Sequence, residues 1–264
     1  MKITPQINPQ KNLKQALKDS FKNVLWRFTG DYKNSLLNLN NYCNKFFGEK
    51  AVILCNGPSL NNVIFEDLQG VKTFGLNKIN LLFDRTLFRP SFIVAVNKYV
   101  IEQNEDFYRS TKIPLFLSQK PSRKVGIDAN SNRTLLYTSE GFPGFSGDPR
   151  SAISEGATVT YAALQLAYFM GFSKIALVGC DHSFSSKGPD HKAVVSGEND
   201  VDHFDKRYFS KGVKWQLPSI AESEESYLKA KRFFEKDSRI IYNCTVGGKL
   251  EIYPRLSLDE FLIL

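Results

Sequence analysis

Polar side chains follow several apolar runs of the sequence, at the points where predicted strands would end. They are Asn56, Gly57, Pro58 and Ser59 after one run, Asn77 and Asn97 after the next two, and Asp181 with His182 after a later one. An asparagine side chain offers a hydrogen-bond donor and an acceptor without a charge to desolvate, so it suits a base edge, a ribose or a sugar. The Asn-Gly-Pro-Ser turn alone is as compatible with an ordinary turn as with a phosphate-binding turn. Asparagines at three successive strand ends favour a ligand site.

The three histidines of the chain, His182, His191 and His203, each follow an aspartate within one polar stretch. One interpretation is a catalytic general base that works near neutral pH. His203 is then the first candidate, because it lies deepest in the stretch, and His182 is the second. Another interpretation is that Asp181 and a histidine hold Mg²⁺ or Mn²⁺. A third is a solvated polar loop with no special role, and the residues alone leave all three open.

The same stretch carries cations and aromatic rings further along the chain. They include Lys206, Arg207, Tyr208 and Lys214. Such a set suits a diphosphate leaving group and the ring of a sugar. A cluster of cations is equally typical of a solvated surface, so this feature supports a function only if the fold brings it to a site.

The elements that must position these residues alternate along the chain. Apolar strand patterns cover 51–55, 71–77, 91–97, 113–118, 174–181 and 239–245, and helical patterns cover 154–172 and 220–237. This alternation predicts an α/β, Rossmann-like fold, in which helices cover both faces of a mostly parallel sheet. Ligands of such sheets bind at the carboxyl ends of the strands. Residues 185–219 have little periodicity and predict an insertion that is either a functional lid or a disordered loop.

The first 48 residues form a basic helical segment ahead of the Rossmann-like domain predicted for 49–264. Residues 1–50 contain nine Lys or Arg and three Asp or Glu, and apolar residues recur at helical spacing over 11–47. With Trp26, Phe46 and Phe47, this segment could lie on an anionic membrane surface. The alternative is a helix packed against the main domain.

Composition limits the partners without choosing among them. The 264 residues carry a net charge of +8 and the pI is about 9.2, which favours an anionic partner. Nucleic acid is not expected, because the positive charge is spread along the chain and no recognition motif appears. The four cysteines form no C-x-x-C pattern, which fits a reducing cytoplasm. Without a signal-peptide pattern or an apolar run of about 18 residues, we expect a cytoplasmic protein, either soluble or peripheral at the inner membrane face, and a homo-oligomer stays open.

Four segments together resemble a known group of bacterial proteins. They read ILCNGPSL (53–60), FGLN (74–77), FIVAVN (92–97) and MGFSKIALVGCD (170–181). They resemble the bacterial CMP-sialic acid sialyltransferases and the wider group that includes the archaeal 6-hydroxymethylpterin pyrophosphokinase and the motility-associated flagellin glycosyltransferases. The segment IYNCTVGGKLEIYPR (241–255) is similar to the uncharacterised bacterial, pterin-kinase-like branch of that group. The resemblance covers most of residues 50–256.

The resemblance implies roles for the strand-end residues. The Asn56–Ser59 turn would hold the phosphate or ribose of a nucleotide, and Asn77 and Asn97 would contact a CMP-sugar. A loop at the start of a helix would also face the nucleotide, and its residues are Ser154, Glu155 and Gly156. One feature departs from the sialyltransferases, since the position of their catalytic histidine falls near Glu222 here.

These observations predict a glycosyltransferase that uses a nucleotide-activated sugar, most simply CMP-linked, and a glycan or a lipid-linked sugar as acceptor. No cofactor is required, with Mg²⁺ or Mn²⁺ as the alternative. A second hypothesis is a pterin pyrophosphokinase that needs ATP and Mg²⁺, for which Asp181 is an available carboxylate. A third is a nucleotide- or glycan-binding module without catalytic activity.

Overall fold

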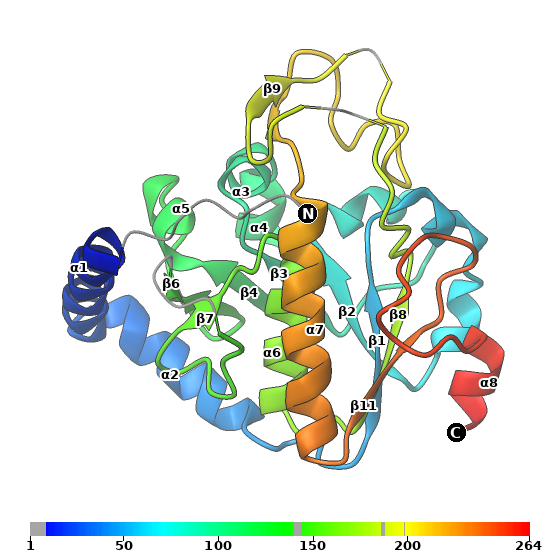
Figure 1. Ribbon diagram of the computed structural model, residues 1–264, viewed down its shortest axis with the longest axis horizontal. Coiled ribbons are helices and arrows are strands. Elements are labelled where there is room, and N and C mark those ends of the chain that lie inside the picture. Colours follow the sequence, from blue (N-terminus) through cyan, green and yellow to red (C-terminus); the bar gives the residue numbers. More distant parts are fainter. Residues whose placement is uncertain (1–8, 140–143, 186–187, 198) are drawn as a thin grey trace.

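A computed structural model of the chain describes residues 9–139, 144–185, 188–197 and 199–264, with side chains from residue 17 onward. Its centre is a seven-stranded sheet in the order β11-β8-β1-β2-β3-β4-β5, in which all neighbouring strands are parallel (Figure 1). The strands are β1 Lys50–Leu54, β2 Lys72–Leu76, β3 Phe92–Ala95, β4 Leu115–Ser118, β5 Arg133–Leu136, β8 Lys174–Val178 and β11 Ile240–Asn243. The predicted α/β fold with a parallel sheet is confirmed.

The order of the strands reverses at β1. The chain adds β2 to β5 on one side of β1, and then crosses back to place β8 and β11 on the other side. The turns that follow β1 and β8 therefore leave the sheet in opposite directions and open a crevice between them, which is where sheets of this type bind ligands.

Helices cover both faces of the sheet. They are α1 Pro9–Arg27, α2 Gly30–Tyr42, α3 Lys98–Gln103, α4 Glu105–Ser110, α5 Gln119–Lys124, α6 Val159–Phe169, α7 Ile220–Lys236 and α8 Leu258–Ile263, with 3-10 turns η1 Pro58–Asn62, η2 Phe65–Leu68 and η3 Ile79–Leu82. In β1, Ala51 and Ile53 face the core under α2, α6 and α7, while Val52 and Leu54 face the opposite core. Such strands are buried on both faces, which explains their continuous apolar runs.

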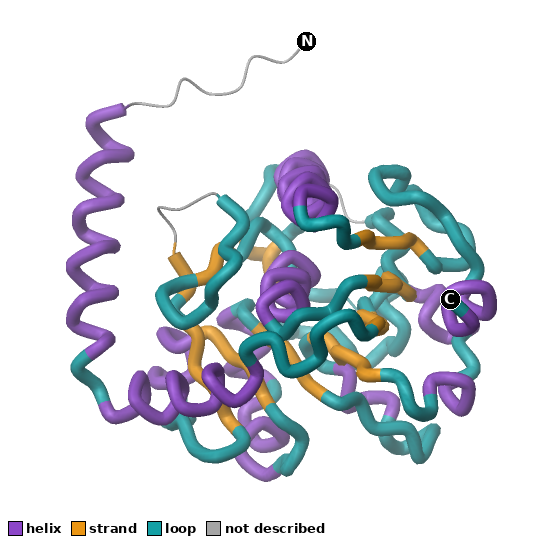
Figure 2. Tube along the Cα trace, turned by 90° about the horizontal axis from the view of Figure 1, so that it is seen from below, coloured by secondary structure: helices purple, strands orange, loops and turns teal. Residues whose placement is uncertain are grey.

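The N-terminal segment forms two helices rather than one. The break lies at Thr29, whose hydroxyl donates to the carbonyl of Trp26 and accepts from the N–H of Tyr32, so that it caps α2. α2 packs along β5, where Ser35 Oγ accepts a hydrogen bond of 2.9 Å from the N–H of Leu135. α2 therefore packs against the sheet as part of the main domain, whereas α1 lies at the edge of the molecule (Figure 2). Within the part of the chain that the structure describes, no helix is both long enough and apolar enough to cross a bilayer.

Two sequence predictions need correction. The helix predicted over 154–172 begins only at Val159, because Gly156 and Ala157 adopt φ of +55° and +59° and cannot continue a helix. The preceding residues Ile153–Ser154 instead form β7, which pairs with β6, Thr138–Ser139. The strand β5 went unpredicted because only four residues carry its pattern. Between β6 and β7, residues 140–143 lie outside the described part.

The insertion at 185–219 is folded over the carboxyl ends of the strands. It contains an antiparallel hairpin of β9, Ala193–Val195, and β10, Lys214–Gln216, which lies above the sheet in Figure 1. Its aromatic residues Phe204, Tyr208 and Trp215 are buried against the body of the protein. Within the described residues, which leave out 186–187 and 198, this segment is therefore an ordered lid. The interpretation of this segment as a disordered loop was wrong. Its sequence has little periodicity because the residues that it buries are irregularly spaced.

A buried lysine anchors the lid to the body. Lys78, which follows β2, is 7% exposed, and its Nζ donates to the carbonyl of Tyr208 at 2.6 Å and to Gln103 Oε1 at 2.8 Å. Burial lowers the pKa of Lys78 to about 8.

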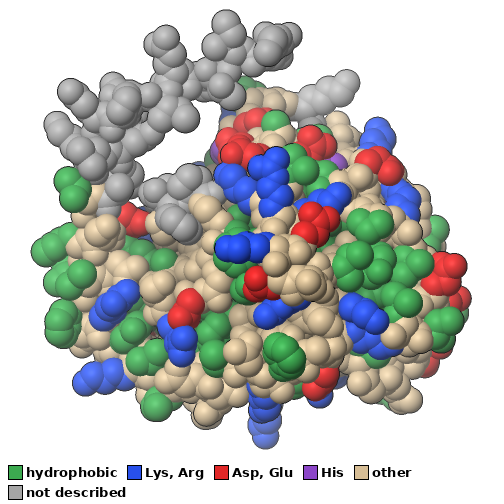
Figure 3. Space-filling view, turned by 60° about the horizontal axis from the view of Figure 1, so that its bottom comes forward, with side chains coloured by type: hydrophobic (Ala, Val, Ile, Leu, Met, Phe, Trp, Pro, Cys, Tyr) green, Lys and Arg blue, Asp and Glu red, His purple; other side chains and the backbone are tan. Residues whose placement is uncertain are grey.

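Lys and Arg side chains elsewhere are scattered among hydrophobic ones on the face shown in Figure 3.

The depressed pKa predicts an unusual dependence of stability on pH. Between about pH 8 and the ordinary lysine pKa of about 10.4, the unfolded chain binds a proton that the folded chain does not. The free energy of unfolding contributed by Lys78 should therefore rise with pH, by up to about 1.4 kcal/mol per unit. Urea denaturation of the wild type and of Lys78→Met at pH 7.5 to 9.5 measures this difference.

The comparison with Lys78→Met is needed because other groups titrate in the opposite sense. Burial raises the pKa of Cys244 to about 12, so stability contributed by that thiol falls as the pH rises above its unfolded value. Both proteins share that loss. Parallel stability curves for the two proteins would contradict the assignment of a depressed pKa to Lys78.

Candidate functional site

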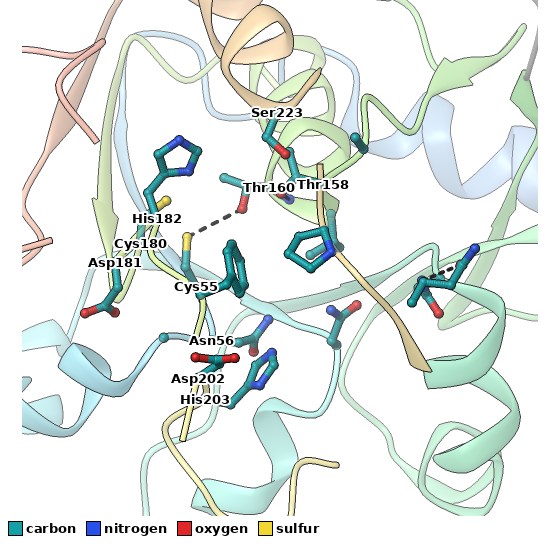
Figure 4. A pocket seen from close by; sticks show the side chains of 18 of the residues that line it. Cys55, Asn56, Thr158, Thr160, Cys180, Asp181, His182, Asp202, His203 and Ser223 are labelled. Atoms are coloured by element: carbon teal, nitrogen blue, oxygen red, sulfur yellow. Dashed lines mark hydrogen bonds between the residues drawn. The ribbon is translucent and has the colours of Figure 1, made fainter. Parts of the chain in front are cut away.

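A cavity of about 400 Å³ lies in the crevice between β1 and β8, beneath the lid. Its floor is formed by the turns after the two strands, Cys55 to Gly57 and Gly179 to His182, and its walls by the start of α6 and the lid (Figure 4). Of the residues predicted from the sequence, it is lined by Asn56, Gly57, Asn77, Asn97, Glu155, Asp181, His182, His203 and Tyr208. Residues far apart in the sequence thus meet where the strand order reverses.

Two asparagines of this cavity carry an unsatisfied amide oxygen. Asn56 Oδ1 and Asn77 Oδ1 are buried and have no hydrogen-bond partner within the described residues. The backbones of both residues are fixed, since the carbonyl of Asn56 accepts from the N–H of Phe204 and the N–H of Asn77 donates to the carbonyl of Val94. A buried acceptor without a partner costs about 1–3 kcal/mol. Two such oxygens on one cavity wall therefore call for a ligand that donates hydrogen bonds.

The third asparagine plays a different part. Asn97 Oδ1 accepts from the N–H of Tyr99 at 2.9 Å and of Val100 at 3.4 Å, so it caps α3. Its Nδ2 donates to Gln216 Oε1, on the lid, at 3.4 Å. Asn97 lines the cavity, but its amide is already engaged in holding α3 and β10.

The turn after β1 is closed by a contact with the turn after β8. Ser59 donates to Asp181 Oδ2 through its hydroxyl at 2.7 Å and through its N–H at 3.2 Å. Gly57 is required here, because a Cβ at this position would lie 2.0 Å from the same carboxylate oxygen. Ser59 and Pro58 are outside the cavity lining, at the start of η1. The close backbone approach expected at Gly57 is thus made to Asp181.

The loop before α6 presents hydroxyl groups that the sequence did not single out. Ser154 is buried away from the cavity, with its N–H and carbonyl both bonded to the side chain of Gln165. Gly156 is packed against Tyr161 and is also absent from the lining. The cavity is instead lined by Glu155, Thr158 and Thr160. The start of α6 therefore brings two hydroxyls to the cavity lining, while the N–H groups of Thr160 and Tyr161 donate to the side chain and the carbonyl of Thr158.

Two buried cysteines form part of the floor. Cys55 Sγ lies 3.6 Å from Thr160 Oγ1 (Figure 4), and Cys180 Sγ lies 3.7 Å from Tyr227 Oη. Contact with Cys180 and burial together raise the pKa of the Cys55 thiol, so it stays protonated near neutral pH. The two cysteines are the buried, apolar residues that their positions after β1 and β8 predict.

His203 is held by a carboxylate in the manner of a general base. Its Nδ1 lies 2.8 Å from Asp200 Oδ2, and its ring stacks on Tyr208 with a centroid separation of 3.9 Å. Asp200 is itself fixed by the N–H groups of Asp202 and Phe209. A proton on Nδ1 satisfies the carboxylate and leaves Nε2 as the basic nitrogen. His203 lines the cavity and lies near Asn56 in Figure 4, so that nitrogen is available to a ligand.

The other two histidines contact glutamates of α7. His182 Nε2 lies 3.1 Å from Glu224 Oε1, and His191 Nε2 lies 2.8 Å from Glu222 Oε2. Neither histidine is paired with the aspartate that precedes it in the sequence. The position where the sialyltransferase resemblance expects a histidine, Glu222, thus has His191 beside it in space.

The predicted cationic cluster is not gathered at the cavity. Arg207 is held by Asp205 and Asp84 on the outside of the lid, and Lys206, Arg207 and Lys214 are all absent from the cavity lining. Tyr208 alone of the four lines it, as the ring beneath His203. The sequence could not show this, because the partners of Arg207 lie both beside it and on a distant turn.

No group of three or more His, Cys, Asp or Glu side chains suited to a metal ion occurs in the described ranges. The carboxylate of Asp181, which the metal interpretation requires, is engaged by Ser59.

Comparison with known proteins supports the same fold. The structure of the MAf glycosyltransferase from Magnetospirillum magneticum AMB-1 matches with a TM-score of 0.50 and 13% sequence identity, over 86% of this chain and 38% of that one. At this identity the likeness concerns the fold alone, and the chain spans well under half the length of that protein. No curated protein sequence matches the chain.

A family description covers the larger part of the chain. It reads 6-hydroxymethylpterin diphosphokinase MptE-like and matches residues 11–187, from α1 through the turn after β8. This match confirms the family resemblance that the segments around the turns after β1 and β8 indicated in the sequence. The chain belongs to the MptE-like family.

Proposed function

We propose that the cavity binds a nucleotide-activated sugar and that the protein transfers the sugar to an acceptor hydroxyl. The observation that carries this proposal is the His203–Asp200 pair, set on the same cavity as two unpaired amide oxygens. The amides require a ligand with hydrogen-bond donors, and the paired histidine can take a proton from a nucleophile. Binding groups and a base thus share one cavity.

The polar groups of the cavity suit a nucleotide with a single phosphate. Asn56 Oδ1 and Asn77 Oδ1 would accept from the amino group of a base or from ribose hydroxyls. The first turn of α6, with Thr158 and Thr160, would hold the phosphate. These phosphate donors are neutral, which suits the single negative charge of a phosphodiester better than a triphosphate. We therefore propose a CMP-linked sugar as donor.

The transfer itself needs one proton movement and one displacement. His203 Nε2 takes the proton of the acceptor hydroxyl, and the acceptor oxygen forms a bond to the anomeric carbon of the sugar. The bond from that carbon to the phosphate oxygen breaks, and the phosphate leaves with the electron pair. The hydroxyls of Thr158 and Thr160 at the start of α6 stabilise the charge that develops on it, while Asp200 stabilises the protonated imidazole.

Removing either amide should weaken nucleotide binding. We expect Asn56→Ala and Asn77→Ala each to reduce affinity for CMP by about 1–3 kcal/mol, because a donor of the bound nucleotide loses its partner. The measurement is a thermal-shift and titration panel of CMP, CDP, UDP, GDP, ADP and ATP, with and without Mg²⁺. The exposed Asn62, on the same turn, gives the matched control Asn62→Ala. Folded cavity variants that bind CMP as tightly as this control would remove the proposed nucleotide site.

Loss of the base should affect turnover rather than binding. We expect His203→Asn to lower the rate of CMP release from a CMP-linked sugar by about 10²–10⁴ at saturating donor, with donor affinity unchanged. His191→Asn is measured alongside, since His191 also lines the cavity but its Nε2 lies 2.8 Å from Glu222 Oε2. If His182→Asn abolishes turnover while His203→Asn preserves it, the base lies at the end of β8 instead.

A second function is favoured by the family description, which names a pterin diphosphokinase. This reaction would use ATP with Mg²⁺, and the same two amides could accept from the amino groups of a pterin. Stabilisation by ATP with Mg²⁺ but not by CMP, together with AMP formation when 6-hydroxymethylpterin is added, would support it. Binding of CMP without turnover of any donor would instead indicate a binding module.

A further inference from the structure

The described part of helix α1 turns apolar side chains to solvent, whereas a surface helix of a water-soluble domain turns its apolar face to the core. Five apolar side chains point to solvent, four in the last turns of α1 and one directly after it. They are Leu17 (63% exposed), Phe21 (65%), Val24 (50%), Leu25 (53%) and Phe28 (79%). Their spacing places them within one stripe of the helix. We call these five residues the α1 stripe.

The opposite side of α1 is held to the protein by polar contacts. Asp19 accepts from the hydroxyl of Tyr137 at 2.9 Å, and Asn23 donates to the carbonyl of Ser151 at 2.9 Å. Among residues 17–28, the part of this region whose side chains are described, Trp26 alone is buried, at 5% exposure. The orientation of the helix is therefore fixed by its polar side, and the stripe is left facing outward.

The charges beside the stripe select its partner. Helix α1 contains five Lys or Arg and one Asp, a net charge of +4. Lys18, Lys22 and Arg27 are exposed on its flanks. Two copies of such a helix would repel each other if they packed stripe to stripe, whereas an anionic bilayer complements both the stripe and its flanks.

A second cavity borders the stripe and adjoins the proposed site. This cavity, of about 820 Å³, lies between α1 and the ends of β3 and β4, and Leu25 of the stripe forms part of its lining. Lys22 and Lys98 line it as well. It shares Asn97 and Gln216 with the first cavity. The second cavity, lined partly by lysines, thus lies between the stripe and the donor site.

We propose that the α1 stripe seats this protein on an anionic membrane surface. The proposal deepens the proposed function and rests on it in one respect, because it names the membrane as the source of the acceptor, a lipid-linked sugar carrying phosphate. The stripe inserts its apolar side chains among the lipids, and the flanking cations contact the anionic headgroups. The second cavity then opens beside the bilayer.

Vesicle sedimentation with the full chain tests this proposal. The probes are vesicles of phosphatidylcholine alone and of phosphatidylcholine with about one-third phosphatidylglycerol. We expect binding only to the anionic vesicles, with at least a tenfold loss when salt is raised from 0.1 to about 0.5 M, since the flanking charges become screened. The double variant Phe21→Glu, Phe28→Glu should lose binding by a similar factor. Leu87→Glu, at an exposed leucine far from α1 in the sequence, is the matched control and should bind as the wild type does.

Three results of the vesicle assay would overturn the proposal. They are equal binding to neutral vesicles, no vesicle binding at all, and unchanged binding by the Phe21→Glu, Phe28→Glu protein. Sedimentation velocity without lipid tests whether the stripe instead binds a second copy of the chain. A wild-type dimer that the double variant abolishes would assign the stripe to a second copy and overturn the membrane proposal. Thermal shift with CMP is measured on the same proteins, so that failure of nucleotide binding is distinguished from failure of membrane binding.

Discussion

The parallel pairing of β1 with β8 is the constraint on which the rest of the site depends. These strands lie side by side in space although the chain makes four other strands of the same sheet between them. Their carboxyl ends meet in one crevice, and the contact from Ser59 to the Asp181 carboxylate ties the two turns together. Gly57 permits this contact because a side chain there would occupy the position of the carboxylate. The floor of the cavity is thus built into the sheet, and the lid and α6 add its walls.

The residues of this cavity carry unfavourable contributions to the free energy of folding that a purely structural turn would not require. The two amide oxygens of Asn56 and Asn77 are buried without partners, and Asn77 also adopts a φ of +49°. Together these features represent several kcal/mol of unfavourable free energy, which a bound ligand with suitable donors would offset. The buried Lys78 beside them, which holds the lid, belongs to the same pattern of polar groups placed where apolar ones would be more stable.

Much of the fold could be predicted from the sequence, because buried parallel strands have continuous apolar runs and their ends are marked by polar turns. The position of Asn56 and Asn77 at one edge of the sheet follows from this rule. The roles of individual side chains could not be predicted, since they depend on partners distant in the sequence. Ser59 and Asn97 have the residue types of ligand-binding groups, yet Asp181 and the start of α3 engage them. Likewise, the sequence shows an aspartate before each histidine, whereas the carboxylate that orients His203 is Asp200.

The central claim is that the crevice between β1 and β8 is a nucleotide site organised by two unpaired amide oxygens, Asn56 Oδ1 and Asn77 Oδ1. A crystal structure of the protein grown with CMP tests it most directly. The account predicts hydrogen-bond donors of the nucleotide about 3 Å from Asn56 Oδ1 and Asn77 Oδ1, with the phosphate at the first turn of α6. A nucleotide bound elsewhere, or bound in this cavity without contact to either amide, would contradict it.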